Sequence, residues 1–301
     1  MRKFWALALG FAITILLASP ATAHRRDDGT LRILAIGNSF SDDGMEHLPA
    51  LLENLGVKNV ELARLYVGGC SLERHNHFYN NETPAYMFYH SKAGENRWTM
   101  RNPVTMQHAL AMGKWDIITL QQVSGDSGIY ESYIPHLEEL IKIVVKMQPQ
   151  AEIVWHMTWA YSSESPHKDF PRYDRNQQKM FEAIHQCVKN LKKDYKIKTI
   201  IPSGTAIQSL RMSAVNNPPM DFTRDGYHLD LGTGRYAAAC TWYETLIKPY
   251  THISMMGNTL RPNAGTKVSE EMAPYIHKAA KRAVKQPFKA REIKGKGKGK
   301  R

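Results

Sequence analysis

Three side chains in this sequence could together activate a serine nucleophile: Ser39, Asp225 and His228. Ser39 ends the run 37–39, Gly-Asn-Ser, which follows the apolar stretch 31–36, so it is expected where a buried strand enters a tight turn. Asp225 precedes His228 by three residues, a spacing that lets both side chains lie on one side of a turn. A serine hydroxyl needs a histidine to take its proton, and the histidine needs a carboxylate to orient it. The sequence therefore predicts a nucleophile, a base and an acid, provided that the two segments meet.

The apolar runs within 31–247 predict the elements that position these side chains. Strands are expected where short apolar runs end in polar residues, and helices where apolar residues recur every three or four positions. The predicted strands are 31–36, 60–66, 115–120, 152–157 and 198–202, and the predicted helices are 47–55, 133–147, 176–191 and 234–247. Alternating strands and helices favour an α/β fold, a three-layer α/β/α sandwich with a central parallel sheet. Functional side chains should gather beyond the carboxyl ends of its strands.

The segment 71–101 is long, polar and rich in His, Asn and Tyr, without a clear periodicity. A loop of this length is typically functional or disordered, and its six aromatic residues disfavour disorder. We predict an insertion that shapes a substrate cleft. Its histidines His75, His77 and His90 could alternatively seed a zinc site, although no carboxylate or cysteine completes a familiar ligand spacing.

Residues 1–23 have the layout of a secretory signal peptide. A positive start is followed by fifteen uncharged residues and by an Ala-x-Ala pattern that ends at Ala23. Fifteen apolar residues are short for a membrane span, which needs about 20, so we expect no stable membrane insertion after cleavage. The prediction is an exported protein, periplasmic or secreted, with a linker at 24–30; an uncleaved anchor is the alternative.

Positive charge is concentrated at the C-terminus. The formal net charge is +12, and residues 286–301 contribute seven Lys or Arg against one Glu. Alternating Lys and Gly favours a disordered, solubilising tail; contact with nucleic acid, a membrane or an acidic polysaccharide is the alternative. Aromatic residues do not interleave the basic ones, as single-strand binders usually require. We therefore expect no nucleic-acid partner.

The three cysteines, Cys70, Cys187 and Cys240, are an odd number without metal-type spacing. An exported chain could form one disulfide and keep one thiol. Three cysteines are too few for a disulfide scaffold, so the hydrophobic core must stabilise the fold.

The run 37–41, Gly-Asn-Ser-Phe-Ser, resembles the first block of the SGNH (GDSL-type) hydrolase superfamily, with Asn in place of the usual Asp. Asp225 and His228 are similar to the last block, which carries the acid and the base. Gly-Gly at 68–69 fits the second block, whose glycine N–H serves the oxyanion hole. The resemblance covers about 31–247, and it is closest to a branch of exported bacterial proteins marked by the Gly-Asn-Ser-Phe-Ser block.

The resemblance implies an oxyanion hole formed by the N–H groups of Ser39 and Gly69 and by one side-chain amide. The superfamily's third block supplies an asparagine, but this chain has Gln121 and Gln122 after its third predicted strand. A glutamine carries the same amide donor on a longer stem. Either Gln121 or Gln122 could fill this role; we expect Gln122 to be the third donor and Gln121 to contact substrate.

Two further residues are predicted to bind substrate. Arg224 adjoins Asp225 and could pair with a substrate carboxylate; a salt bridge that orients its own turn is the alternative. His156 ends a predicted strand at the same edge of the sheet, and a place in the packed core is its alternative.

These observations predict an SGNH-type hydrolase domain over 31–285 that needs no cofactor and no metal. Its expected activity is an exported serine esterase that removes acetyl or methyl esters from a carbohydrate. Two rivals remain open from the sequence: a non-catalytic glycan-binding protein with the same fold, and a metal-assisted hydrolase that uses His75 and His77.

Overall fold

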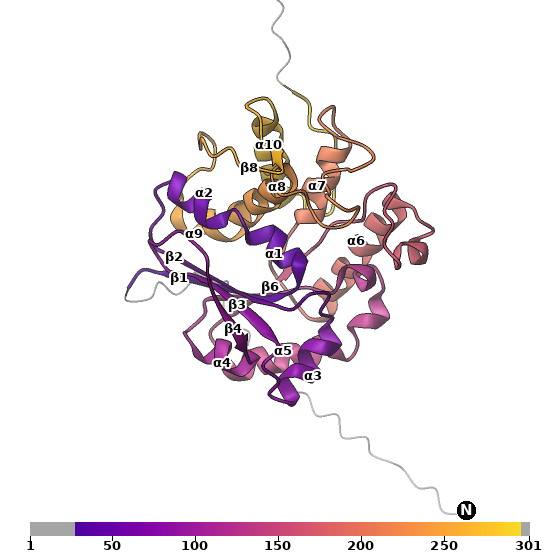
Figure 1. Cartoon of the computed structure of the whole chain (residues 1–301). Helices are drawn as coiled ribbons and strands as arrows, with labels where there is room; N and C mark the ends of the chain where they lie inside the picture. Colours follow the sequence, from indigo (N-terminus) through magenta and orange to yellow (C-terminus); the bar gives the residue numbers. More distant parts are fainter. Residues whose placement is uncertain (1–27, 296–301) are drawn as a thin grey trace, which may run out of the picture.

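The computed structural model describes residues 28–295, and a seven-stranded sheet in the order β4-β3-β2-β1-β5-β6-β7 lies at its centre (Figure 1). The strands are β1 Leu31–Gly37, β2 Val60–Tyr66, β3 Tyr86–Ser91, β4 Thr99–Val104, β5 Ile117–Leu120, β6 Glu152–His156 and β7 Ile200–Ile201. Strands β2, β1, β5, β6 and β7 are parallel, whereas β3 and β4 each run antiparallel to their neighbour. The predicted α/β fold with a central parallel sheet is confirmed, and two strands that the sequence did not predict, β3 and β4, extend the sheet at this edge.

Helices cover both faces of the sheet (Figure 1). In one layer, α8 packs against four other helices: α1 Ser39–Met45, α2 Leu48–Asn54, α7 Ser203–Arg211 and α10 Met272–Lys285, with α8 itself at Thr233–Trp242. In the opposite layer, α3 Leu72–Asn80, α4 Met106–Ala111 and α5 His136–Met147 pack on one another. The remaining elements are α6 Gln177–Asp194, a π-helical turn Tyr243–Ile247, α9 Lys248–Thr251, the short ribbon β8 Asn263–Ala264 and β9 Thr266–Lys267, and three 3₁₀ turns at Ser124–Asp126, Tyr130–Tyr133 and Phe170–Tyr173. These layers confirm the predicted three-layer sandwich.

The sequence of β1 explains its central position. Six of its seven residues are buried, as expected of a parallel strand that is covered by helices on both faces. In the helical layer, α8 contains three consecutive buried alanines at 237–239. Small side chains let neighbouring helices approach closely, so α8 can contact α1, α7 and α10 together.

The segment 71–101 forms regular structure rather than a long irregular loop. It contains α3 and β3 and the start of β4, and β3 pairs with β2. Tyr86 and Phe88 of β3 are buried in the core, which accounts for the aromatic content of the segment. Its role in shaping a substrate cleft stays a prediction.

The C-terminal segment corrects the predicted start of the tail. Residues 286–295 pack on the domain: the N–H of Arg291 donates to Ser209 Oγ at 3.2 Å, and that of Ile293 donates to Ser213 Oγ at 2.7 Å. The side chain of Ile293 is buried. Only 296–301 remains of the predicted disordered tail, and it lies outside the described residues.

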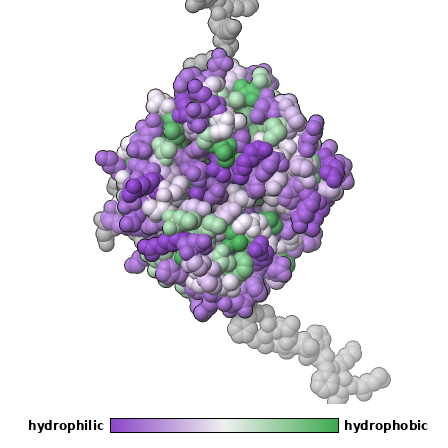
Figure 2. All heavy atoms as spheres, viewed as in Figure 1, coloured by the Kyte–Doolittle hydropathy of each residue, from purple (hydrophilic) through white to green (hydrophobic). Residues whose placement is uncertain are grey.

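The predicted signal peptide at 1–23 and most of the linker also lie outside the described residues. Within residues 28–295, no helix combines the length and apolar character that a membrane span requires. Hydrophilic residues predominate on the face shown in Figure 2, where apolar residues form small separate spots. All three cysteines are free and buried, so the structure contains no disulfide among them.

Candidate functional site

Ser39 lies where β1 ends and α1 begins. Asn38 caps this helix, because its side-chain Oδ1 accepts a hydrogen bond from the N–H of Phe40 at 3.0 Å. The N–H of Ser39, the first residue of α1, precedes the helical hydrogen bonds. It donates to no acceptor within residues 28–295, so it is available to an oxyanion that forms next to the Ser39 side chain.

The structure joins the three predicted side chains in one hydrogen-bonded chain. Ser39 Oγ lies 2.8 Å from His228 Nε2, and His228 Nδ1 lies 2.6 Å from Asp225 Oδ2. When His228 Nδ1 is protonated and donates a hydrogen bond to Asp225, the lone pair of Nε2 faces the Ser39 hydroxyl. This tautomer can take the hydroxyl proton, so the arrangement can generate a serine nucleophile.

The turn that contains Asp225 is shaped around its carboxylate. Oδ1 accepts hydrogen bonds from the N–H groups of His228 at 2.8 Å and Tyr227 at 3.2 Å. Burial by itself would raise the pKa of Asp225. Hydrogen bonds from the ring and the N–H of His228 outweigh this effect, so the pKa lies below its ordinary value of 3.8. Gly226 has φ +90°, and a Cβ there would lie 2.8 Å from Cδ of Pro166. Only glycine fits this turn, and the turn holds Asp225 ionised beside the imidazole.

Asp43 connects α1 to this turn. Its fully buried carboxylate accepts from Arg224 Nη1 at 3.1 Å, from the Leu229 N–H at 2.8 Å and from Arg235 Nε at 2.8 Å. Arg224 and Leu229 flank the segment that contains Asp225 and His228, so one carboxylate on α1 fixes both ends of that segment. Arg224 also donates to the carbonyl of Leu229. The structure therefore shows the salt bridge that was the alternative to substrate contact for Arg224, although 32% of this side chain remains exposed.

The Gly68-Gly69 turn follows β2 and lies beside the Ser39 turn. Asn38 Nδ2 donates to the carbonyl of Cys70 at 3.0 Å and so ties the two turns together. Arg74 Nη1 donates to the carbonyls of Gly69 at 3.0 Å and Gly68 at 3.4 Å. The carbonyl of Gly68 and the N–H of Gly69 belong to one trans peptide and point in opposite directions. Because this carbonyl faces Arg74, the Gly69 N–H points away from Arg74. Gly69 is exposed with φ +58°, and its N–H has no partner within residues 28–295.

Gln122 does not face the oxyanion site, contrary to the prediction. Its Oε1 accepts from the N–H groups of Leu72 at 3.1 Å and Val123 at 2.8 Å. Its Nε2 donates to the carbonyl of Ser132 at 3.0 Å and to the Ser132 hydroxyl at 3.1 Å. The amide is buried and its donors are used to join the loop after β5 to α3, so no donor remains for an oxyanion.

Gln121 and His156 are also structural, contrary to their predicted contact with substrate. Both are buried. Gln121 Nε2 donates to Asn38 Oδ1 at 2.7 Å, and its Oε1 accepts from Ser41 Oγ and, at 3.2 Å, from His156 Nδ1. His156 Nε2 lies 3.0 Å from Ser203 Oγ, and burial lowers the pKa of His156 to about 3. The packed-core alternative for His156 is therefore correct. Gln121 bonds to Asn38 and Ser41 on either side of Ser39, and His156 bonds to Gln121.

Three aromatic residues near the site escaped the sequence analysis. The Tyr227 ring lies 4.3 Å from the His228 ring, and the His167 ring lies 4.6 Å from that of Tyr227. Trp159 donates to the carbonyl of Tyr227 at 2.8 Å and fixes the backbone next to the base. His167 Nδ1 accepts from the Asp169 N–H at 3.2 Å, so its other nitrogen carries the proton. No motif marks His167; its place soon after β6, at the predicted active edge, is the only signal.

The histidines of the alternative zinc site do not converge. His75 is buried, with Nδ1 2.9 Å from the hydroxyl of Tyr86, while His77 is exposed and His90 pairs with Glu61 at 2.8 Å. Within residues 28–295, no group of three or more His, Cys, Asp or Glu side chains is arranged to hold a metal. The residues present do not fit the metal-assisted alternative.

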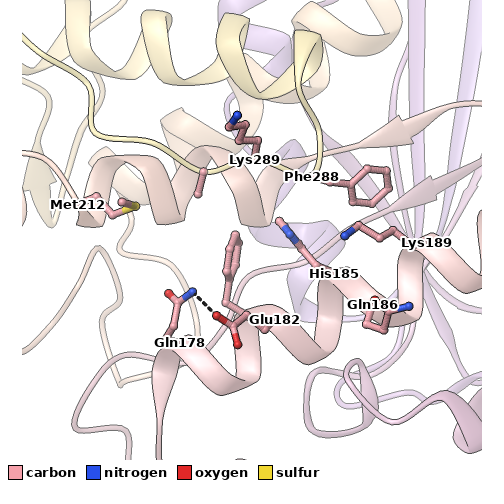
Figure 3. A pocket seen from close by; sticks show the side chains of 10 residues that line it. Gln178, Glu182, His185, Gln186, Lys189, Met212, Phe288 and Lys289 are labelled. Atoms are coloured by element: carbon pink, nitrogen blue, oxygen red, sulfur yellow. Dashed lines mark hydrogen bonds between the residues drawn. The ribbon is translucent and has the colours of Figure 1, made fainter.

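A surface pocket of about 590 Å³ lies away from this site, between α6 and the segment 286–290 (Figure 3). It is lined by Gln178, Glu182, His185, Lys189 and Phe288 among others. None of the three hydrogen-bonded residues of the candidate site lines it.

Comparison with known proteins identifies the family. A family model described as "Domain of unknown function (DUF4886)" matches residues 32–283. The crystal structure of a DUF4886 family protein from Bacteroides uniformis has a TM-score of 0.80 and 39% sequence identity, and the match covers 88% of this chain and 98% of that chain.

Other solved structures are more remote. A proposed SGNH hydrolase from Slackia heliotrinireducens has a TM-score of 0.49 and 19% identity, covering 72% of this chain and 98% of that chain. A catalytic mutant of an acetylxylan esterase from Geobacillus stearothermophilus has a TM-score of 0.46 and 11% identity, covering 72% and 94%. No curated protein matches the sequence. The family model spans most of the chain, and the protein belongs to the DUF4886 family.

Proposed function

We propose that this protein is an exported serine ester hydrolase of the SGNH type. The observation that carries the proposal is the chain of hydrogen bonds from Ser39 Oγ through His228 to Asp225, at 2.8 and 2.6 Å. The SGNH-like blocks at both ends of the sequence support the same assignment. Ser39 is the nucleophile, His228 the general base and acid, and Asp225 the orienting carboxylate.

The geometry supports a two-step reaction. Ser39 Oγ attacks the ester carbonyl carbon while His228 Nε2 takes the hydroxyl proton, and the ionised Asp225 stabilises the resulting imidazolium. His228 then gives this proton to the leaving alcohol, and the acyl group remains on Ser39. In the second step His228 deprotonates a water molecule, which releases the acyl group as a carboxylic acid and restores Ser39.

Two backbone groups are assigned to the oxyanion hole, the N–H of Ser39 and the N–H of Gly69. Both are without a partner within residues 28–295, and both lie on turns that Asn38 ties together. One such donor typically contributes about 10²–10³ in rate. Gln122 is not assigned to the hole, because its amide donors bond to Ser132.

A carbohydrate ester is the proposed substrate class, either an acetylated sugar or a methyl-esterified uronic acid. The signal-like sequence at 1–23 supports export to where polysaccharides occur. The Tyr227 ring lies next to His228, and the His167 ring lies next to Tyr227. Aromatic faces suit the C–H faces of sugar rings, while the His167 N–H can donate to a hydroxyl.

The proposal is tested by labelling with a fluorophosphonate, followed by mass spectrometry of the peptide that contains Ser39. The wild type should be labelled at Ser39 and should release p-nitrophenol from p-nitrophenyl acetate with an initial burst. Ser39→Ala should lose both the label and the activity. Ser41→Ala is the matched control, because Ser41 bonds to Gln121 instead of to His228, and it should retain the label.

Absence of label on the folded wild type, or equal hydrolysis by wild type and Ser39→Ala, would refute the proposal and favour a non-catalytic glycan-binding protein. If Ser39 is labelled, a panel of acetylated and methyl-esterified glycans separates the two substrate classes by the product released, acetate or methanol.

A further inference from the structure

A surface at the C-terminal end of the described chain is strongly basic. Helix α10 carries cations at positions 278, 281, 282 and 285, a spacing that places them on one side of the helix. The segment that follows adds three more cations and a single acid, Glu292. We call this the C-terminal basic surface, and it comprises Lys278, Lys281, Arg282, Lys285, Lys289, Arg291 and Lys294.

The two rows of cations are held side by side. Lys278 Nζ donates to the carbonyl of Lys294 at 3.0 Å, and Arg282 Nη1 donates to the carbonyl of Glu292 at 3.2 Å. These contacts show that the segment after α10 turns back along the helix. The buried side chain of Ile293 anchors it, so the backbone that carries these cations is ordered instead of belonging to a disordered tail.

The positive charge of this surface is not neutralised within the protein. Among residues 28–295, none of its seven cations forms an ion pair with a carboxylate, whereas Arg32, Arg64 and Arg235 elsewhere each do. A concave site of about 330 Å³ lies between the two rows and is lined by Lys278, Arg282, Arg291, Glu292 and Lys294. Clustered like charges raise the local potential and attract an anionic ligand.

We propose that the C-terminal basic surface binds an extended anionic polysaccharide through its carboxylate or sulfate groups. This inference rests on the proposed function, because it supplies a docking site for the polymer that carries the ester. It also favours an acidic sugar chain over a neutral one as the substrate. The sequence continues with Lys296, Lys298, Lys300 and Arg301, which extends the same charge pattern.

Two other polyanions fit this surface less well. Binding to an anionic membrane usually combines basic residues with several exposed apolar anchors. None of the exposed large apolar side chains of residues 28–295 lies within 272–295, and Met212 is the one that shares a pocket with a cation of this surface, Lys289. Single-stranded nucleic acid needs aromatic stacking platforms. The two aromatic residues of this region, Tyr275 and Phe288, are partly buried against the core. Phe288 lines the pocket next to α6, and neither ring lines the site between the two rows of cations.

The test compares two charge-matched triple variants of the full chain. The first triple variant combines Lys281→Glu, Lys285→Glu and Lys289→Glu. These lysines are exposed, and their side chains make no hydrogen bond within residues 28–295. The control combines Lys114→Glu, Lys146→Glu and Lys193→Glu, which are also exposed but lie on other elements. Affinity for polygalacturonate, dextran sulfate and neutral dextran is measured by titration calorimetry at low and high salt.

The wild type should bind polygalacturonate or dextran sulfate but not dextran, and salt should weaken the binding. The first triple variant should lose at least about tenfold in affinity for the anionic polymer, and the control should lose much less. Preference between the two polymers identifies carboxylate or sulfate as the recognised group. Equal losses in both variants, or tighter binding of the wild type to phosphatidylglycerol vesicles or an oligonucleotide, would overturn the proposal.

Failure of this inference can be distinguished from failure of the proposed function. Hydrolysis of p-nitrophenyl acetate and labelling of Ser39 should be unchanged in the first triple variant, because its substitutions are outside the candidate site. If the wild type is labelled at Ser39 but does not bind the polymers, the esterase proposal stands and the docking surface is rejected. If it binds them without labelling, the reverse holds.

Discussion

The molecule contains two hydrogen-bonded chains of the same form in different environments. In the first, Ser39 Oγ lies 2.8 Å from His228 Nε2, and His228 Nδ1 lies 2.6 Å from Asp225. In the second, Ser203 Oγ lies 3.0 Å from His156 Nε2, and His156 Nδ1 lies 3.2 Å from Gln121 Oε1. The first histidine side chain is 20% exposed, whereas His156 is 1% exposed.

The difference identifies what the proposed chemistry requires besides a serine next to a histidine. An amide oxygen carries no charge to stabilise an imidazolium, and burial lowers the pKa of His156 to about 3. His156 therefore cannot hold a proton at neutral pH. Ser203 is fully buried, so no substrate reaches it. Only the hydrogen-bonded chain of Ser39, His228 and Asp225 combines a carboxylate with access to solvent.

The largest expected effect comes from making the first chain end on an amide, as the second does. Asp225→Asn should lower kcat/KM on p-nitrophenyl acetate by about 10⁴, because the neutral amide neither orients His228 nor stabilises its cation. Circular dichroism should show an unchanged fold. A loss of less than tenfold would mean that the carboxylate is not what distinguishes the two chains.

The next largest loss of activity is expected at Asp43, which connects α1 to the segment that contains Asp225 and His228. Asp43→Asn should lower kcat by about 10- to 100-fold with little change in KM, because the Arg224 and Leu229 contacts that position His228 weaken. The matched control is Asp42→Asn. Asp42 pairs with Arg64 and Arg235 and makes no hydrogen bond to the turn of the base, so kcat should change less. Equal effects of the two substitutions would argue against a positioning role for Asp43.

Removing the serine of the second chain should affect stability instead of activity. Ser203→Ala leaves a buried histidine nitrogen with a weaker partner, which should cost about 1–3 kcal/mol of unfolding free energy. Urea unfolding gives this value, and kcat/KM should stay within about threefold of the wild type. A loss of activity comparable to that of Ser39→Ala would show that the buried chain also takes part in the reaction.

A pH dependence of stability is also expected from the buried histidines, and its size grows as the pH falls. Burial lowers the pKa of His156 from 6.5 in the unfolded chain to about 3 in the folded one. The unfolded chain therefore takes up this proton first, so the stability is fully present above about pH 6.5 and declines as the pH falls towards 3. One such group contributes up to about 1.4 kcal/mol per pH unit. Urea unfolding between these values should show a shallower slope for His156→Gln; an unchanged slope would contradict this origin.

Local patterns were sufficient for the centre of the fold and for the three hydrogen-bonded residues. The strand at 31–36 is apolar except for Arg32, the strand at 60–66 follows an alternating pattern, and Ser39 lies two residues after the end of β1. Strand β4 has no such pattern, because five of its six residues are exposed at the sheet edge. The hydrophobic pattern of β4 therefore does not indicate that this segment pairs with β3.

Long-range contacts account for the failures at the site. Gln122 has the right chemistry for an oxyanion donor, but its amide is used by Ser132 and Leu72 on other segments. Asp43 contacts residues that are more than 180 positions away, so no local signal could show its role. In the tail, Ile293 is one buried residue among many cations, and composition alone predicted disorder there.

The antiparallel edge of the sheet also affects how the molecule behaves at high concentration. Within residues 28–295, β4 has a neighbouring strand on one side only, and an unpaired edge can recruit a strand from a second molecule. Pro103 removes one backbone donor from this edge, and the exposed Arg101 places a charge on it. The strand that leaves the sheet open thus also carries the residues that oppose aggregation.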